Sequence, residues 1–202
     1  MFQRILSVTG VLCVVTLLSA SPSFAVEKPT SLLKNKDNTK ISSTYEPQSL
    51  TLSTEQGQIL YSYHENKKVD PASLTKMMTM YLTLDAVKSG KLHMNDKVKI
   101  TTQQAQLSRK SNLSSVPLKA GQIYTVKEIL SQTALASSNA AALILGEKVS
   151  KSTSTFTDQM NQQAKQFHMN HTHYTSPTGA DTHLLGPSAP EKYKNQGKTQ
   201  ST

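Results

Sequence analysis

The spacing of apolar and polar residues along this 202-residue chain predicts one hairpin followed by four helices. Two short runs of β-forming residues, 50–53 and 59–63, flank a turn that contains Gly57, as in a β-hairpin. Asp70 and Pro71 predict the start of a helix that runs to about Lys88, because Asp is a good N-cap and Pro is tolerated at the first helical position. Its apolar residues at positions 74, 77, 78, 81 and 84 predict a face that packs against another element.

Three more helices are expected in the second half of the chain. The first begins at Thr125, which has the capping-box spacing to Glu128, and ends near Leu135. The almost wholly apolar run over residues 140–149 predicts a buried helix. An amphipathic helix follows Ser154, and one of its faces is marked by Phe156, Met160, Ala164 and Phe167.

The two ends of the chain carry a weaker pattern than its middle. Residues 1–25 are typical of a signal peptide, with Arg4 before an apolar stretch and small residues leading to cleavage after Ala25. A retained membrane helix is the alternative, but the stretch is shorter than the roughly 20 apolar residues that a bilayer requires. We expect an extended lead-in over residues 26–49, a folded domain over residues 50–185, and an irregular polar tail over residues 186–202 that adds no core element.

The composition of the chain indicates where the protein is located and what kind of partner it binds. The single cysteine, Cys13, lies in the expected signal peptide, so we expect a mature chain without disulfides. The 22 Lys and Arg residues outnumber the 13 Asp and Glu residues, which makes the chain basic. Outside the cell, such a surface favours anionic wall polymers or the membrane surface over nucleic acid. We therefore expect an exported protein in the cell wall or on the outer face of the cytoplasmic membrane.

A serine nucleophile is the strongest candidate chemistry. Ser-x-x-Lys occurs twice, at residues 31–34 in the lead-in and at residues 73–76 in the first turn of an expected helix. In the second copy, Lys76 follows Ser73 by one turn on the same face. Backbone N–H groups at a helix start favour a developing oxyanion. Burial beneath Met77 and Met78 would lower the pKa of Lys76, so that it could act as a base.

A second polar motif lies on the short link between two expected helices. Ser137 and Asn139 could point from this link into a cleft, although a Ser-x-Asn sequence alone is more often an ordinary helix cap. Four histidines raise the alternative of a metal site, but no carboxylate or cysteine accompanies them at ligand spacing. We expect neither a metal nor a cofactor; the histidines are His168, His171, His173 and His183.

Taken together, these motifs resemble the low-molecular-mass penicillin-binding proteins with serine-type D-alanyl-D-alanine carboxypeptidase activity, most closely the Gram-positive penicillin-binding protein 4 type. Four stretches carry the resemblance: DPASLTKMMT at residues 70–79, AGQIYTV at 120–126, SSNAAA at 137–142 and THYTSPTG at 172–179. It implies an α+β fold of the β-lactamase/transpeptidase type. Residues 50–185 would be a partial catalytic domain, with the helix-rich part and a hairpin present and much of the central antiparallel sheet missing.

The resemblance also implies a role for each motif residue. Ser73 would attack peptidoglycan stem peptides that end in D-Ala-D-Ala, and Lys76 would take its proton. Ser137 would pass a proton to the leaving amine, and Asn139 would bind the substrate amide. β-Lactam antibiotics mimic the same terminus, and no cofactor is implied.

The chain departs from this family at its third motif. A late Lys-Thr-Gly is missing, and Gly-Lys-Thr-Gln at residues 197–200 is not a substitute. The family's C-terminal membrane anchor is absent as well. We therefore expect a truncated chain that gives no adduct with fluorescent penicillin. The alternatives are a catalytically incompetent or wall-associated binding protein and, less favoured, a serine β-lactamase, for which the required Glu-x-x-Leu-Asn is missing.

Overall fold

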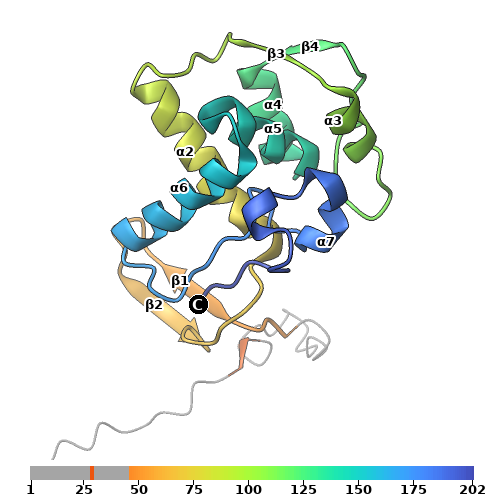
Figure 1. The fold of residues 1–202 in the computed structure, drawn as a ribbon. Helices are drawn as coiled ribbons and strands as arrows, with labels where there is room; N and C mark the ends of the chain where they lie inside the picture. The colour runs from red at the N-terminus through yellow and green to blue at the C-terminus, as the bar shows by residue number, and fades with distance from the viewer. Residues whose placement is uncertain (1–27, 30–45) are drawn as a thin grey trace, which may run out of the picture. The chain divides into compact units, whose positions relative to one another are not determined.

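The computed structural model describes residues 28–29 and 46–202. The expected signal peptide at residues 1–25 and most of the expected lead-in at residues 26–49 lie outside these residues. Contacts between elements join Pro47–Thr202 into one unit, which is the part described below (Figure 1).

The expected hairpin is confirmed. Strand β1 (Leu50–Ser53) pairs antiparallel with β2 (Ile59–Tyr63), and Leu50 lies opposite Tyr63. The turn closes through a 3.0 Å hydrogen bond from the Gly57 N–H to the Thr54 carbonyl. Gly57 adopts a φ of +84°, a conformation that glycine reaches without the penalty a Cβ would bring.

The segment that carries Ser73 begins with a 3₁₀ turn rather than with an α-helix. Turn η2 (Ala72–Thr75) leads directly into α2 (Lys76–Lys88). The Asp70 carboxylate accepts a 2.8 Å hydrogen bond from the Ala72 N–H, and Ala72 has a φ of +45°. The chain therefore becomes α-helical only at Lys76. The predicted end at Lys88 is confirmed.

Three further helices match the expected ones, and the middle one lies among the others (Figure 1). Helix α4 (Val126–Leu135) begins with the predicted capping box, in which Thr125 and Glu128 each bind the other's backbone N–H. Helix α5 (Asn139–Ser150) is buried along its apolar run and packs against α2, α4 and α6 (Thr153–Gln166). Phe156, Met160 and Ala164 of α6 are buried as expected, whereas Phe167 is exposed.

Several short elements were not predicted. Strand β3 (Lys97–Lys99) pairs antiparallel with β4 (Ile123–Thr125), and α3 (Thr102–Leu107) lies between them in the chain. After the last long helix come α7 (Thr182–Leu185), η3 (Gly186–Ser188) and η4 (Glu191–Tyr193). None of these is long enough to show a periodic pattern in the sequence. We infer that each depends on contacts with residues distant in sequence.

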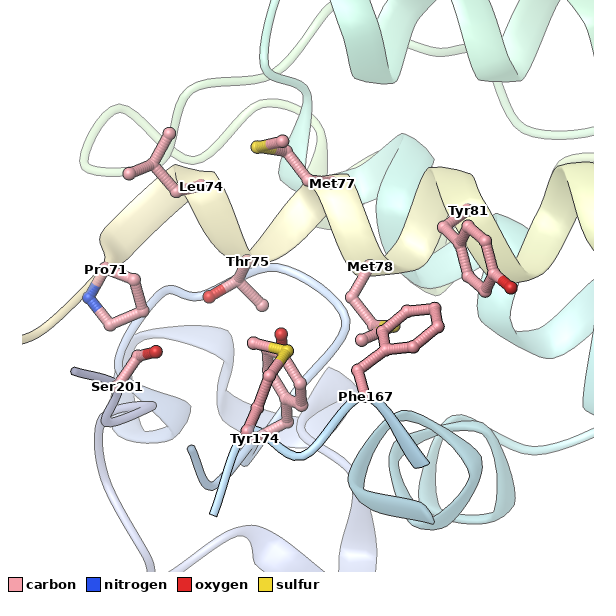
Figure 2. A pocket seen from close by; sticks show the side chains of 10 residues that line it. Pro71, Leu74, Thr75, Met77, Met78, Tyr81, Phe167, Tyr174 and Ser201 are labelled. Atoms are coloured by element: carbon pink, nitrogen blue, oxygen red, sulfur yellow. The ribbon is translucent and has the colours of Figure 1, made fainter. Parts of the chain in front are cut away.

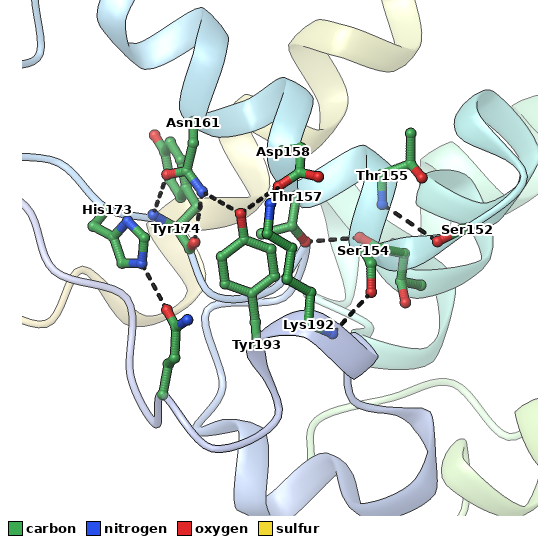
Figure 3. Close-up of polar contacts among 12 residues, drawn as sticks. Ser152, Ser154, Thr155, Thr157, Asp158, Asn161, His173, Tyr174, Lys192 and Tyr193 are labelled. Atoms are coloured by element: carbon green, nitrogen blue, oxygen red, sulfur yellow. Dashed lines mark hydrogen bonds and ion pairs between the residues drawn. The ribbon is translucent and has the colours of Figure 1, made fainter.

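The tail is better anchored than the sequence predicts. Tyr193 is only 5% exposed, and its hydroxyl donates a 2.5 Å hydrogen bond to the Asp158 carboxylate on α6 (Figure 3). Backbone bridges also pair Ser201 with Val69 and Gln200 with His173. Residues 186–202 thus form two short 3₁₀ turns rather than a further helix or strand, and they contribute a buried aromatic side chain, Tyr193, that packs beside α6. A single buried tyrosine produces no period in the sequence.

Helix α2 is oriented differently from the prediction. Of its expected apolar face only Met78 is buried, while Leu74 and Met77 are 68% and 63% exposed and Tyr81 is also exposed. The inward face instead consists mainly of polar and small residues, namely Thr75, Lys76, Thr79, Thr83 and Ala86. The predicted packing of this apolar stripe is therefore confirmed for Met78 and wrong for Leu74 and Met77, while Tyr81 keeps an edge contact with the Phe167 ring, 5.1 Å between ring centres. No helix in residues 46–202 combines the length and apolar character needed to cross a membrane.

Candidate active site

Ser73 and Lys76 form a hydrogen-bonded pair at the junction of η2 and α2. The Lys76 Nζ donates to the Ser73 Oγ at 3.1 Å and to the Thr178 carbonyl at 2.8 Å. The Ser73 side chain is exposed, whereas Lys76 is only 2% exposed. An accessible hydroxyl beside a buried amine is the arrangement that a serine nucleophile and its base require.

Burial lowers the pKa of Lys76 to about 8. At pH 7, roughly a tenth of such lysines are neutral and able to accept a proton, far more than at the ordinary pKa near 10.4. The expected cover by Met77 is wrong, because that side chain points to solvent. The lysine is instead covered from the side of Thr178, whose carbonyl contacts its Nζ. Desolvation lowers the pKa of the Lys76 amine, and the Thr178 carbonyl holds the amine in this buried position.

Gly179 lets this covering segment lie directly against the turn that carries Ser73. A Cβ on Gly179 would lie 1.9 Å from the Ala72 carbonyl oxygen and 2.6 Å from the Thr75 Oγ1. Its φ of +74° also belongs to the left-handed region. Only glycine fits here without moving the backbone, so Gly179 keeps the Thr178 carbonyl close to Lys76.

In the second motif, residues 137–139, the middle residue caps the following helix. The Ser138 Oγ caps α5 by accepting a hydrogen bond from the Ala141 N–H. Ser137 is half-buried, has a φ of +51° and makes no side-chain hydrogen bond within residues 46–202. A non-glycine residue in this conformation is uncommon, and such residues cluster at functional sites. The Ser137 hydroxyl is thus available for chemistry that a capping serine could not perform.

Asn139 is held by a loop that precedes the motif in sequence. Both its backbone N–H and its Nδ2 donate to the Ser114 carbonyl, at 2.8 and 2.9 Å, and the side chain is buried. The next N–H, of Ala140, donates to the Ser115 Oγ at 3.2 Å. Packing of α5 on α2 brings the two motifs onto neighbouring helices, but no hydrogen bond in the described chain joins Ser137 or Asn139 to Ser73. The roles expected for these residues remain predictions.

Two backbone carbonyls shape the site and were missed by sequence reasoning. The Thr178 carbonyl holds Lys76, and the Ser114 carbonyl holds Asn139. Backbone atoms leave no signature in residue type. The only available signal for Thr178 was the Pro-x-Gly pattern around it, and Ser114 carried none.

The Gly-Lys-Thr-Gln stretch has structural contacts in this fold. The Lys198 Nζ lies 3.2 Å from the Asp70 carboxylate, and Thr199 is buried where its hydroxyl accepts the Thr175 N–H at 3.3 Å. The expectation that residues 197–200 do not replace the missing motif remains a prediction.

An apolar groove of about 380 Å³ runs along the exposed side of η2 and α2 (Figure 2). Met77, Tyr81 and Phe167 line it, together with Tyr174 and Ser201 from later segments. The groove passes beside Thr75, two residues from Ser73.

The histidines do not gather into a metal centre. His173 contacts Gln196 at 2.8 Å, and His183 contacts Asp181 at 2.8 Å, where hydrogen bonds from His183 lower the pKa of the Asp181 carboxyl group. Across residues 28–29 and 46–202, no three His, Cys, Asp or Glu side chains come together as metal ligands.

Comparison with known proteins identifies the family. A family model described as D-alanyl-D-alanine carboxypeptidase matches residues 36–191. The chain belongs to the D-alanyl-D-alanine carboxypeptidase family. D-alanyl-D-alanine carboxypeptidase DacF of Bacillus subtilis is 37% identical over 123 residues, which cover 61% of this chain and 31% of DacF. DacA of Haemophilus influenzae is 33% identical and is covered over 32% of its length.

Solved structures confirm the resemblance to penicillin-binding proteins and the expected α+β fold class. A peptidoglycan synthesis regulatory factor, PBP3 of Streptococcus pneumoniae, superposes with a TM-score of 0.69 at 30% identity, covering 76% of this chain and 43% of that one. Penicillin-binding protein D2 of Listeria monocytogenes, in its ampicillin-bound form, gives 0.60 at 27% identity, covering 76% and 55%. The chain thus spans about a third of these curated carboxypeptidases and about half of the solved neighbours.

Proposed function

We propose that this chain carries the nucleophile site of a serine-type D-alanyl-D-alanine carboxypeptidase, a hydrolase that acts on peptidoglycan stem peptides ending in D-Ala-D-Ala. One observation carries the proposal: the Nζ of a buried lysine, with a pKa lowered to about 8, lies 3.1 Å from an exposed serine hydroxyl. Family membership supplies the substrate class.

The reaction would proceed through an acyl-enzyme. Lys76 takes the proton of Ser73 as the Oγ attacks the carbonyl carbon of the penultimate D-Ala. The peptide C–N bond then breaks, and the terminal D-Ala leaves as an amine after it receives a proton through Ser137. Water subsequently attacks the ester carbonyl carbon and gives a proton to Lys76. The ester C–O bond then breaks, and Lys76 passes that proton to the Ser73 oxygen, which releases the shortened peptide and free Ser73.

Asn139 would orient the substrate amide during this reaction. Its fixation by the Ser114 carbonyl supports the role, because a side chain held by its neighbours loses little freedom on binding. β-Lactams would acylate the same serine, in keeping with the ampicillin-bound form of a structural neighbour.

Localisation and wider partners form part of the same proposal. We propose an exported protein outside the cytoplasmic membrane, supported by the signal-peptide pattern of residues 1–25 and by the peptidoglycan substrate of the family. The excess of Lys and Arg supports weak association with anionic wall polymers or with the membrane surface.

Incubation of the full chain with fluorescent penicillin, followed by intact-mass measurement, tests the activity. The sequence alone predicted no adduct because Lys-Thr-Gly is missing. Because Ser73 and Lys76 are hydrogen-bonded in the structure, we now expect slow labelling of the chain by penicillin. Ser73→Ala should abolish this labelling. Ser31→Ala, in the other Ser-x-x-Lys copy, is the matched control and should label normally.

Two outcomes would contradict the proposal: no adduct on the unaltered chain at millimolar penicillin, or an adduct that persists in Ser73→Ala. The lifetime of the adduct separates the alternatives. A penicillin-binding protein keeps it, whereas a β-lactamase would lose it within seconds and continue to hydrolyse a chromogenic cephalosporin.

A further inference from the structure

The position of Lys76 depends on a backbone carbonyl that lies far away in the sequence. Its 2.8 Å hydrogen bond to the Thr178 carbonyl is shorter than its 3.1 Å bond to Ser73, and 102 residues separate Lys76 from Thr178. Whatever fixes the segment around Thr178 therefore fixes the amine as well.

One end of this segment is attached to α6. The Asn161 side chain accepts from the Tyr174 N–H at 2.8 Å and donates to the Tyr174 carbonyl at 2.9 Å, so that it binds both polar groups of one residue (Figure 3). The other end lies on α2, where the Thr79 hydroxyl donates to the Pro177 carbonyl at 2.7 Å. Pro177 directly precedes Thr178.

Thr79 behaves differently from comparable threonines. Four threonines are buried within α2, α4 and α6. Three of them donate their hydroxyl to the carbonyl four residues earlier, the usual local bond of a helical threonine; they are Thr83, Thr133 and Thr157. Thr79 instead donates across to a different segment, although it is completely buried. Its hydroxyl therefore serves a tertiary contact, one turn along α2 from Lys76.

We propose that Thr79 is a positioning residue: its hydroxyl holds the Pro177 carbonyl so that the next carbonyl, of Thr178, faces the Lys76 Nζ. The inference rests on the proposed function in so far as Lys76 is the base. Thr79 itself touches neither the base nor the nucleophile in the hydrogen bonds described. It acts through the backbone of residues 177–178.

Two substitutions on the same helix separate positioning from general stability. Thr79→Val removes the hydroxyl bond to Pro177 and keeps the branched shape. Thr83→Val is the matched control, because it removes an equally buried hydroxyl that bonds only to its own helix. Thr79→Ser restores the hydroxyl and should restore function.

The first measurement is the rate of Ser73 acylation by fluorescent penicillin in the full chain. We expect Thr79→Val to lower the rate by about 10- to 100-fold, since a small displacement of a catalytic group has effects of this size. We expect Thr83→Val to change it little, even if both variants lower the melting temperature equally. Equal loss of rate in both variants, or no recovery in Thr79→Ser, would overturn the inference.

The second measurement does not depend on catalysis. Trace acetylation with acetic anhydride at pH 8, read by peptide mass spectrometry, reports how accessible the Lys76 amine is relative to the exposed Lys119. Release of the covering segment in Thr79→Val should raise Lys76 labelling several-fold, while Thr83→Val should leave it unchanged. If the unaltered chain fails to bind penicillin, the proposed function fails for this chain. Acetylation that is identical in the two variants would instead refute the role of Thr79.

Discussion

Replacement of Gly179 by alanine should separate the covering segment from the turn that carries Ser73. The new Cβ would lie 1.9 Å from the Ala72 carbonyl oxygen, a distance that no side-chain rotation can relieve because the conflicting atom is backbone. The left-handed φ of +74° adds a second penalty of about 1–2 kcal/mol. Gly179→Ala therefore combines strain with a steric overlap.

Gly90 separates these two contributions. It has the same φ of +74°, but a Cβ there would meet nothing within 4 Å. Gly90→Ala should therefore cost about 1–2 kcal/mol, the conformational penalty alone. Gly179→Ala should cost about 4 kcal/mol or more, because the displaced segment also loses its hydrogen bonds to Thr79 and Lys76, worth roughly 1–3 kcal/mol each.

Urea unfolding of the full chain at pH 7, followed by circular dichroism, measures both changes. The midpoint should shift slightly for Gly90→Ala and strongly for Gly179→Ala, which can leave little folded protein given a total stability of about 5–15 kcal/mol. Similar midpoints for the two variants would show that Gly179 is required only for its backbone angle. The close approach to Ala72 would then not hold the site together.

Two further predictions concern Lys76 and the start of α4. Because the pKa of Lys76 falls to about 8 in the folded state, the unfolded chain binds more protons above this pH, so stability should rise with pH between about 8 and 10.4. The full effect is about 3 kcal/mol at 1.36 kcal/mol per pKa unit. It should be present in the unaltered chain and absent from Lys76→Met in urea titrations; identical pH profiles would contradict it. Separately, Thr125→Ala should lower the free energy of unfolding by about 1 kcal/mol, because it removes the cap of α4. Thr125→Ser should keep both the cap and the stability. An unchanged melting temperature in Thr125→Ala would show that the capping box is unimportant.

Features determined within a few residues could be predicted from the sequence. The hairpin turn at Gly57 and the capping box of Thr125 and Glu128 both depend on neighbours at most four positions away. The pairing of Ser73 with Lys76 follows in the same way, because a spacing of three residues brings two side chains to one face of a helical turn whether it is 3₁₀ or α. The family resemblance rested on these same local motifs.

The orientation of α2 could not be predicted. Its apolar spacing indicated a buried stripe, yet Leu74 and Met77 are exposed while Thr79 and Thr83 are completely buried. A period shows which residues share a face, but not which face meets the rest of the fold. Here the polar face turns inward because its hydroxyl groups find carbonyl partners, Pro177 for one and the helix itself for the other.

The sequence by itself determined the nucleophile, its lysine and the cap that begins α4, since each depends on local geometry and residue type. Only the tertiary structure decided why Lys76 has a lowered pKa. Burial of the amine lowers its pKa, and the 2.8 Å contact that holds the amine in place comes from the backbone carbonyl of Thr178, 102 residues further along the chain. Desolvation of an amine is a property of everything packed around it, and no spacing within one helix can report it.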